Sequence, residues 1–495
     1  MNSTYSTQSQ QITTVFEDWP PNRIIIVPLD FAKEKHLARV CLGNGQYLHT
    51  KAFSLNNNQK GIEYLVKRIN SSCSQKKIQK QHVIIASESP HSYAIGFMLA
   101  LKKRGYIVVE VDAYRAKTLR KTHMASSDNI DLDGIANAVI NRHGKDLEER
   151  DEIYHALQAS TRLYKQYTKQ ITAQKNRIHT IIDVLFPGFL SKKKSGIEAF
   201  SRVSVFLMSK NFSVGKIQRM RTKSLIKNLN QYLIPHAQEV AKKLQDYARK
   251  VIAPPKGLIQ GHSSSLEVAI SLLSSLKTAA HAELQHSTEL FIQTPYVSML
   301  SIPGIGIVRA TVIAAELKEP SNWYTLNQTC AFAGIATKTY QSGGEDSAPV
   351  ATCLPKKCNR RLKDAILQTA HQTGMTPHTA GRYEPKFSEH RLQRHYKEVV
   401  SRDGKSGLST GRLLLRVMRP MVLAENIYLP NMSQGDPKEI LSGEELTLYL
   451  SASFEKMDYN LKDFEISSVK NNRLNEMKKQ WQKVFKNLHG IDLKF

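Results

Sequence analysis

The chain has 495 residues and carries 70 Lys and Arg against 43 Asp and Glu, a formal net charge of +27 at pH 7. So large a positive excess indicates a polyanionic partner, with nucleic acid ahead of a membrane surface; the alternative is a solvated surface that is merely basic. Five scattered cysteines form neither a disulfide framework nor a zinc pattern. No apolar run reaches the length of a membrane span, and residues 1–20 contain no apolar leader segment, so we expect a soluble, cytoplasmic protein with no membrane partner.

Residues 1–22 are rich in Ser, Thr and Gln, and we expect them to form a disordered arm. From residue 23 to 148, strand and helix patterns alternate, which is typical of an α/β domain around a mixed or parallel sheet. Its continuously apolar runs indicate strands buried on both faces. The predicted strands are 24–29, 82–88 and 106–112, and the predicted helices are 61–69 and 93–105.

Residues 149–295 form a helical insertion in which apolar residues recur at spacings of three and four. The clearest helical stretches are 163–186 and 266–293. They suit an antiparallel coiled coil that links domains or mediates oligomerisation, and equally two ordinary helices packed within one domain. Between them lies a basic loop, "SKKKSG".

Residues 296–430 are mainly helical and include the sequence "SIPGIGIVRA". Gly304 and Gly306 predict a tight turn of the helix-hairpin-helix kind, whose backbone N–H groups can contact a phosphate. The alternative is a glycine turn that only lets two helices approach each other. Residues 431–495 form a basic C-terminal extension that carries no recognisable motif.

Four carboxylates of the α/β domain follow predicted strands. Asp30 and Glu88 each close a strand, and Asp128 and Asp131 begin the helix in "SSDNIDLDGIA". Carboxylates at carboxyl ends of strands face the crevice where α/β folds place their sites, and four together repel unless a cation lies between them. Oxygen ligands of this kind favour Mg²⁺ or Mn²⁺. For any single aspartate, a helix cap or a dipole contact is the simpler explanation, and Asp133 is predicted to point away in a helix-dipole or surface role.

The order of these motifs resembles a known family. The sequences "LD", "SESPHSY" and "SSDNIDLDGIA" resemble the RuvC-like (RNase H-like) DEDD domain of the insertion-sequence family one-hundred-and-ten (IS110) transposases. The sequences "SIPGIGIVRATVIAAE", "CAFAGIATKTYQSGG" and "KKCNRRLKDAI" resemble the later domain of the same family. The family also includes DNA invertases of pilin genes.

The resemblance implies a metal-bound tetrad of Asp30, Glu88, Asp128 and Asp131, and a serine nucleophile, Ser342, that forms a covalent phosphoserine–DNA intermediate. It further implies a bacterial, nucleoid-associated homodimer or homotetramer acting on donor and target DNA, guided by a structured noncoding RNA. The alternatives are a site-specific invertase of the same family, a RuvC-like endonuclease that uses water only, and a non-enzymatic DNA- or RNA-binding regulator.

The positive charge also yields candidate contacts to phosphate groups. Any one of these lysines and arginines is as readily explained as a solvated side chain. Besides the two turn glycines, the candidates are Lys192, Lys193, Lys194, Arg309, Lys356, Lys357, Arg360 and Arg361.

Overall fold

The computed structural model divides the chain into two compact units, Met1–Arg150 and Asp151–Phe495, and each is described by itself. The residues that it describes are 9–49, 51–88, 94–120, 127–147, 152–210, 213–320, 325–336, 339–340, 350–351, 354–355, 358–375, 390–428, 453–464, 466, 472–490 and 492. Among the described helices, none is both long and apolar enough to cross a lipid bilayer.

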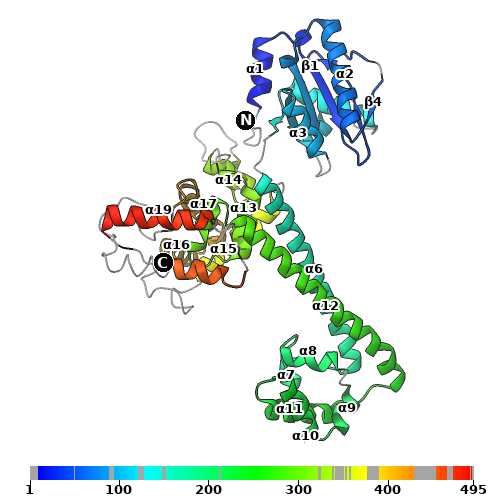
Figure 1. Ribbon diagram of the computed structural model, residues 1–495, viewed down its shortest axis with the longest axis vertical. Helices are drawn as coiled ribbons and strands as arrows, with labels where there is room; N and C mark the ends of the chain where they lie inside the picture. Colours follow the sequence, from blue (N-terminus) through cyan, green and yellow to red (C-terminus); the bar gives the residue numbers. More distant parts are fainter. Residues whose placement is uncertain are drawn as a thin grey trace. The chain divides into compact units, whose positions relative to one another are not determined.

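The first unit is built on a mixed seven-stranded sheet of order β4-β2-β1-β5-β6-β7, with β3 paired to β1 (Figure 1). Strands β1, β5 and β6 run parallel to one another, whereas β2 and β3 pair antiparallel with β1. This confirms the predicted α/β domain with a mixed sheet. The strands are β1 Ile25–Asp30, β2 Lys35–Ala38, β3 Cys41–Leu42, β4 Phe53–Asn56, β5 Val83–Glu88, β6 Ile107–Val111 and β7 Lys145–Asp146.

Strand β1 is apolar throughout because helices cover both faces of the sheet. Its residues Ile25, Val27 and Leu29 belong to one hydrophobic cluster with α2 and α3. Ile26 points to the opposite face, into a cluster with α1, α4 and α5. The helices are α1 Gln10–Asp18, α2 Gln59–Lys76, α3 Ile95–Lys103, α4 Ala113–Thr118 and α5 Asp128–Ile140.

The expectation of a disordered arm over residues 1–22 is wrong for the part that the structure describes. Residues Gln10–Asp18 form α1, and Ile12, Val15 and Phe16 are buried against the sheet. The Ser9 side chain accepts a hydrogen bond from the Ile12 N–H and so caps the helix. The spacing of the three apolar residues is the helical signal that the polar composition of the segment obscures.

The second unit begins with two long helices, α6 Glu152–Leu185 and α12 Lys256–Phe291, which lie side by side (Figure 1). Near one end of the pair the Ser160 hydroxyl donates to the Glu283 carbonyl at 2.9 Å. Farther along, Gln174 Nε2 donates to the Ala269 carbonyl at 2.9 Å. Since the partner number falls as the α6 number rises, the helices are antiparallel.

Between α6 and α12 the chain forms a small helical bundle, which we call the tip bundle (residues 191–256). Its hydrophobic core also includes residues from the adjoining ends of α6 and α12. Its buried residues include Phe206, Leu225 and Leu244. The basic segment at its start, predicted as a loop, contains a short helix that ends at Gly196 in the left-handed conformation. The helices are α7 Lys192–Ser195, α8 Arg202–Ser209, α9 Val214–Arg219, α10 Thr222–Gln231 and α11 Ala237–Lys250.

The rest of the second unit is mostly helical, as predicted, and shares one core. The C-terminal extension belongs to this core rather than extending from it: Trp481 is 1% exposed, and its Nε1 donates to the Glu425 carbonyl at 2.7 Å. The labelled elements are the 3₁₀ helix η3 Pro295–Ser301, α13 Ile307–Leu317, α14 Leu326–Phe332, β8 Thr339–Tyr340, β9 Val350–Ala351, α15 Arg360–Met375, α16 Arg391–Ser401, α17 Ser406–Leu423 and α19 Asn472–His489.

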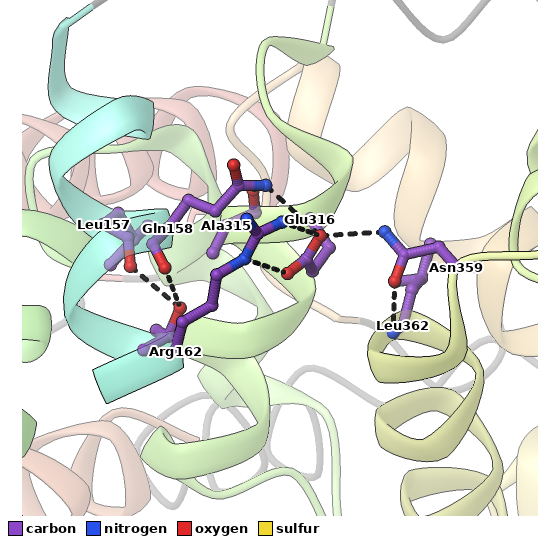
Figure 2. A network of polar contacts seen from close by, with 8 residues as sticks. Leu157, Gln158, Arg162, Ala315, Glu316, Asn359 and Leu362 are labelled. Atoms are coloured by element: carbon purple, nitrogen blue, oxygen red, sulfur yellow. Dashed lines mark hydrogen bonds and ion pairs between the residues drawn. The ribbon is translucent and has the colours of Figure 1, made fainter. Parts of the chain in front are cut away.

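A buried carboxylate joins three helices of this core. Glu316 of α13 is 3% exposed and accepts hydrogen bonds from Gln158 and Arg162 of α6 and from Asn359 before α15 (Figure 2). The Asn359 side-chain oxygen accepts from the Leu362 N–H and so caps α15. The network thereby fixes the start of α15 against α13 and α6.

Candidate active site

Three elements of the first unit bring the four predicted carboxylates to one edge of its sheet. Asp30 and Glu88 are the last residues of β1 and β5, which are parallel neighbours with Leu29 opposite Ser87. Helix α5 packs against β1 and begins with Asp128 and Asp131 in its first turn. Ser127, rather than Asp128, occupies the N-cap position.

The electrostatics of these groups show that they are neighbours. Burial raises the pKa of the Asp30 carboxyl, and the negative charges of Asp131 and Asp128 raise it further. The pKa of Glu88 is also raised, first by burial and then by the charge of Asp30. Asp30, Asp128 and Asp131 therefore each make the ionisation of a neighbouring carboxyl group less favourable, and a bound cation would relieve this repulsion.

Arg120, which sequence reasoning missed, lies among the carboxylates. Its guanidinium Nη2 is 2.7 Å from Asp131 Oδ1, and its charge lowers the pKa of both Asp30 and Glu88. The close approach of α4 to α5 depends on Gly134, because a Cβ there would lie 2.3 Å from the Ala116 carbonyl oxygen. An arginine two residues beyond a helix carries no sequence signal that distinguishes it from a solvated one.

The donor chemistry fits a divalent metal ion, although the described side chains do not surround a common point. The four carboxylates offer only oxygen ligands, as Mg²⁺ and Mn²⁺ prefer, against the single positive charge of Arg120. The Asp131 Oδ1 atom is buried and has an ion pair but no aligned hydrogen bond. Among the described residues, no three His, Cys, Asp or Glu side chains are close enough to hold one ion together.

Comparison with known proteins identifies the family to which the chain is similar. Residues 27–187 match the DEDD transposase model of IS110, and residues 298–384 match the model described as Transposase IS116/IS110/IS902 family. The chain belongs to the IS110 transposase family. The first match contains all four carboxylates of the candidate site, and the second contains Ser342.

A relative of the IS110 family is the "Insertion element IS110 uncharacterized 43.6 kDa protein" of Streptomyces coelicolor. It is 22% identical to this chain over 231 residues, which are 46% of this chain and 55% of the relative. The similarity thus spans about half the length of that protein.

The other residues predicted to take part in catalysis or to contact phosphate groups lie in the second unit. Ser342, Lys356 and Lys357 are outside the described residues. Arg360 and Arg361 are exposed in the first turn of α15. The candidate phosphate contacts on α7 of the tip bundle are also exposed; they are Lys192, Lys193 and Lys194.

The predicted turn is present, but the segment before it is the buried 3₁₀ helix η3 rather than the first helix of a hairpin. Gly304 has φ of +82°, and a Cβ there would lie 2.8 Å from the backbone of Thr373. One side of the turn is therefore closed by α15. Arg309 donates to the Gly304 carbonyl at 3.2 Å, so this side chain has a structural partner, and Gly306 precedes α13 at its N-cap.

Asp133 does point away from the other carboxylates, but the expectation of a helix-dipole or surface role is wrong. Its side chain is 10% exposed, pairs with Arg39 at 3.2 Å and accepts a hydrogen bond from the Tyr47 hydroxyl. The Arg39 guanidinium also lies 3.5 Å from the centre of the Tyr47 ring. Burial, followed by the hydrogen bond to Asp133, raises the pKa of Tyr47. The hairpin after β2 supplies both partners, which no local pattern reveals.

We expect Asp133→Asn to destabilise the first unit by about 2 kcal/mol, because Arg39 then retains a buried charge without its counter-ion. Denaturant unfolding followed by circular dichroism measures the change. In an Arg39→Met background the same substitution should cost clearly less. Equal costs in the two backgrounds would show that the pair contributes nothing.

Proposed function

We propose that the chain is a DNA transposase or site-specific recombinase that cuts and rejoins DNA strands in a RuvC-like (RNase H-like) domain. The observation that carries the proposal is the position of Asp30 and Glu88 at the ends of the parallel neighbours β1 and β5, where burial and neighbouring carboxylates raise the pKa of both groups. Partly buried carboxylates that repel one another are unfavourable for stability, and such groups cluster at sites that serve chemistry.

In this proposal Asp30, Glu88, Asp128 and Asp131 hold Mg²⁺ or Mn²⁺. Bound there, divalent ions would polarise the scissile phosphate and stabilise the attacking and leaving oxygens. Arg120 offsets part of the negative charge and holds Asp131 in place. The exposed position of Asp128 at the beginning of α5 leaves its carboxylate accessible from solvent, as a DNA substrate requires.

The proposed nucleophile is Ser342, which the second family match contains. Its hydroxyl oxygen attacks the scissile phosphorus and forms a serine–phosphorus ester, the 3′-oxygen of the cut strand leaves as a hydroxyl, and the serine proton passes to solvent. Attack by the 3′-hydroxyl of another strand on this ester reverses the step and rejoins DNA without an external energy source.

The proposed partners are donor and target DNA, a noncoding guide RNA and further copies of the chain in a homodimer or homotetramer. The positive charge of the chain supports polyanionic partners. Two alternatives use the same carboxylates: a DNA invertase of the same family, and a RuvC-like endonuclease in which water replaces the serine.

Ser342→Ala distinguishes serine from water as the nucleophile. We expect the variant to form no covalent protein–DNA adduct and to lose cleavage of supercoiled plasmid carrying the element ends by at least tenfold. The matched control is Ser347→Ala in the same segment, which should behave like the unchanged protein. Cleavage by Ser342→Ala at the unchanged rate, with Mg²⁺ present, would establish the water mechanism instead.

A further inference from the structure

The tip bundle lies outside both family matches, which end at residue 187 and resume at residue 298. It has its own helices, α7 to α11, and a core that it shares with the adjoining ends of α6 and α12. The DEDD site and the serine segment therefore do not account for its presence, and its surface provides the evidence for its role.

That surface is strongly basic. Residues 191–256 contain fifteen Lys and Arg against three acidic residues, and all fifteen basic side chains are exposed. Each acid already pairs with a basic neighbour, at 4.0 Å for Lys192–Glu198, 2.6 Å for Lys243–Glu239 and 3.6 Å for Arg249–Asp246. Most of the positive charge is therefore unbalanced by acids of the bundle.

The positive charge of α9 and α10 has no acidic residue near it in sequence. The stretch from 199 to 238 contains no Asp or Glu, and its polar residues include Thr222, Ser224 and Asn230. Arginine, lysine and side chains of this polar kind are the usual donors to phosphate oxygens. The exposed basic residues of these two helices and the turn between them are Lys216, Arg219, Arg221, Lys223 and Lys227.

The orientation of the apolar residues argues against a membrane surface as the partner. A helix that lies on a membrane turns its apolar face outwards. Here Ile217 of α9 and Leu225 and Leu229 of α10 are fully buried in the core of the tip bundle. The exposed large apolar or aromatic residues Tyr232, Leu233 and Ile252 lie in the segments that follow α10 and α11 rather than on the helices, and the Tyr232 ring packs against Phe206.

We propose that the tip bundle is a separate binding site for duplex nucleic acid, which contacts the phosphate backbone through the exposed basic side chains of α9, α10 and the turn between them. The site reads no sequence, since its donors are long, exposed cations. It is independent of the carboxylates of the first unit, so it binds DNA without divalent metal. Duplex DNA and duplex RNA present the same phosphate chemistry, and the experiment includes both.

The test uses the full-length protein with Lys216, Arg219, Arg221, Lys223 and Lys227 replaced by Gln. Fluorescence anisotropy measures the affinity for short duplexes of arbitrary sequence, in DNA and in RNA, over a range of KCl concentrations and in the presence of EDTA. We expect the affinity at low salt to fall at least tenfold for one or both duplexes. The slope of log K against log salt should become less steep by roughly 4, because each phosphate contact contributes about 0.9.

The matched control removes five exposed lysines elsewhere: Lys60, Lys67, Lys77, Lys479 and Lys483. If this control loses as much affinity as the tip variant, binding reflects total charge and the proposal is overturned. Unchanged duplex binding by the tip variant, with weaker binding to phosphatidylserine vesicles, also overturns it. The five substituted residues are exposed, so their replacement should not unfold the protein. An unchanged melting temperature of the tip variant verifies that it is folded.

Discussion

Asp128→Asn and Asp30→Asn are each expected to reduce strand cleavage by roughly a thousandfold, equivalent to about 4 kcal/mol of transition-state stabilisation. An amide carries no charge and is a weaker ligand for a divalent cation than a carboxylate. The measurement is cleavage of supercoiled plasmid carrying the element ends in Mg²⁺. DNA binding in EDTA should remain within twofold of the unchanged protein, because the substitutions remove negative charge rather than positive.

The same substitution at Asp30 is expected to stabilise the first unit at pH 7 in EDTA. The pKa of Asp30 in the folded protein lies above its ordinary value of 3.8, so ionisation costs the folded state more than the unfolded state. This cost is absent below about pH 3.8, grows as the pH rises from there to the folded pKa, and is fully present above the folded pKa. The gain in melting temperature should therefore be largest at neutral pH and vanish towards pH 4.

The effect of Mg²⁺ on the melting temperature gives a second measurement on the unchanged protein and on Asp30→Asn. Binding to the folded state alone raises the melting temperature of the unchanged protein, whereas Asp30→Asn should respond much less. The control is Asp18→Asn, since Asp18 is exposed at the end of α1 and is not one of the groups whose charge shifts the pKa of Asp30 or Glu88. A variant of Asp30 that cleaves normally, or that is less stable than the unchanged protein at pH 7, would contradict the assignment. If a variant that does not cleave DNA kept its normal effect in cells, the non-enzymatic DNA- or RNA-binding regulator would be favoured instead.

Glu316→Ala is expected to destabilise the second unit by about 2 kcal/mol, because it removes the buried acceptor shared by Gln158, Arg162 and Asn359 (Figure 2). The Arg162 side chain is 41% exposed, so water can solvate its charge and limits the cost. The loss leaves the Arg162 guanidinium near α13 without its partner and frees the side-chain amide of Asn359. Denaturant titration followed by circular dichroism gives the change in the free energy of unfolding.

Glu476→Ala is the control for this substitution, since Glu476 is exposed on α19 and should cost less than about 0.5 kcal/mol. Glu316→Gln tests the role of charge, because it preserves the shape of the side chain but places an amide donor next to the Asn359 amide. We expect its cost to lie between those of Ala and the unchanged protein. If Ala at 316 costs no more than Ala at 476, the network does not hold the three helices together.

The central strands could be predicted because burial on both faces leaves a continuous apolar run, which is visible in "RIIIVPLD" and "HVIIASE". The positions of Asp30 and Glu88 at their carboxyl ends followed directly. Helix α1 was missed because its three apolar residues are diluted by polar neighbours. The packing of the C-terminal residues around Trp481 into the core of the second unit was not predicted. Their apolar side chains can be assigned to a core only when the helices that they pack against are known.

The partners of the carboxylates were beyond sequence reasoning for a similar reason. Arg120 reaches Asp131 only because Gly134 lets two helices approach, and Arg39 reaches Asp133 only because a hairpin turns back over α5. Such contacts depend on tertiary packing between segments far apart in the chain. Asp133, judged by its helical spacing alone, could not be recognised as the buried member of an ion pair.

The antiparallel course of α6 and α12 has a consequence for how chains of this kind change in length. Because Gln174 on the outgoing helix contacts Ala269 on the returning one, the chain enters and leaves the tip bundle at adjacent points. Residues between these two points can therefore be inserted, deleted or substituted without changing the path of the rest of the chain. The place of the tip bundle between α6 and α12 is therefore one where a transposase can gain a new binding contact with its substrate while its catalytic segments stay unchanged.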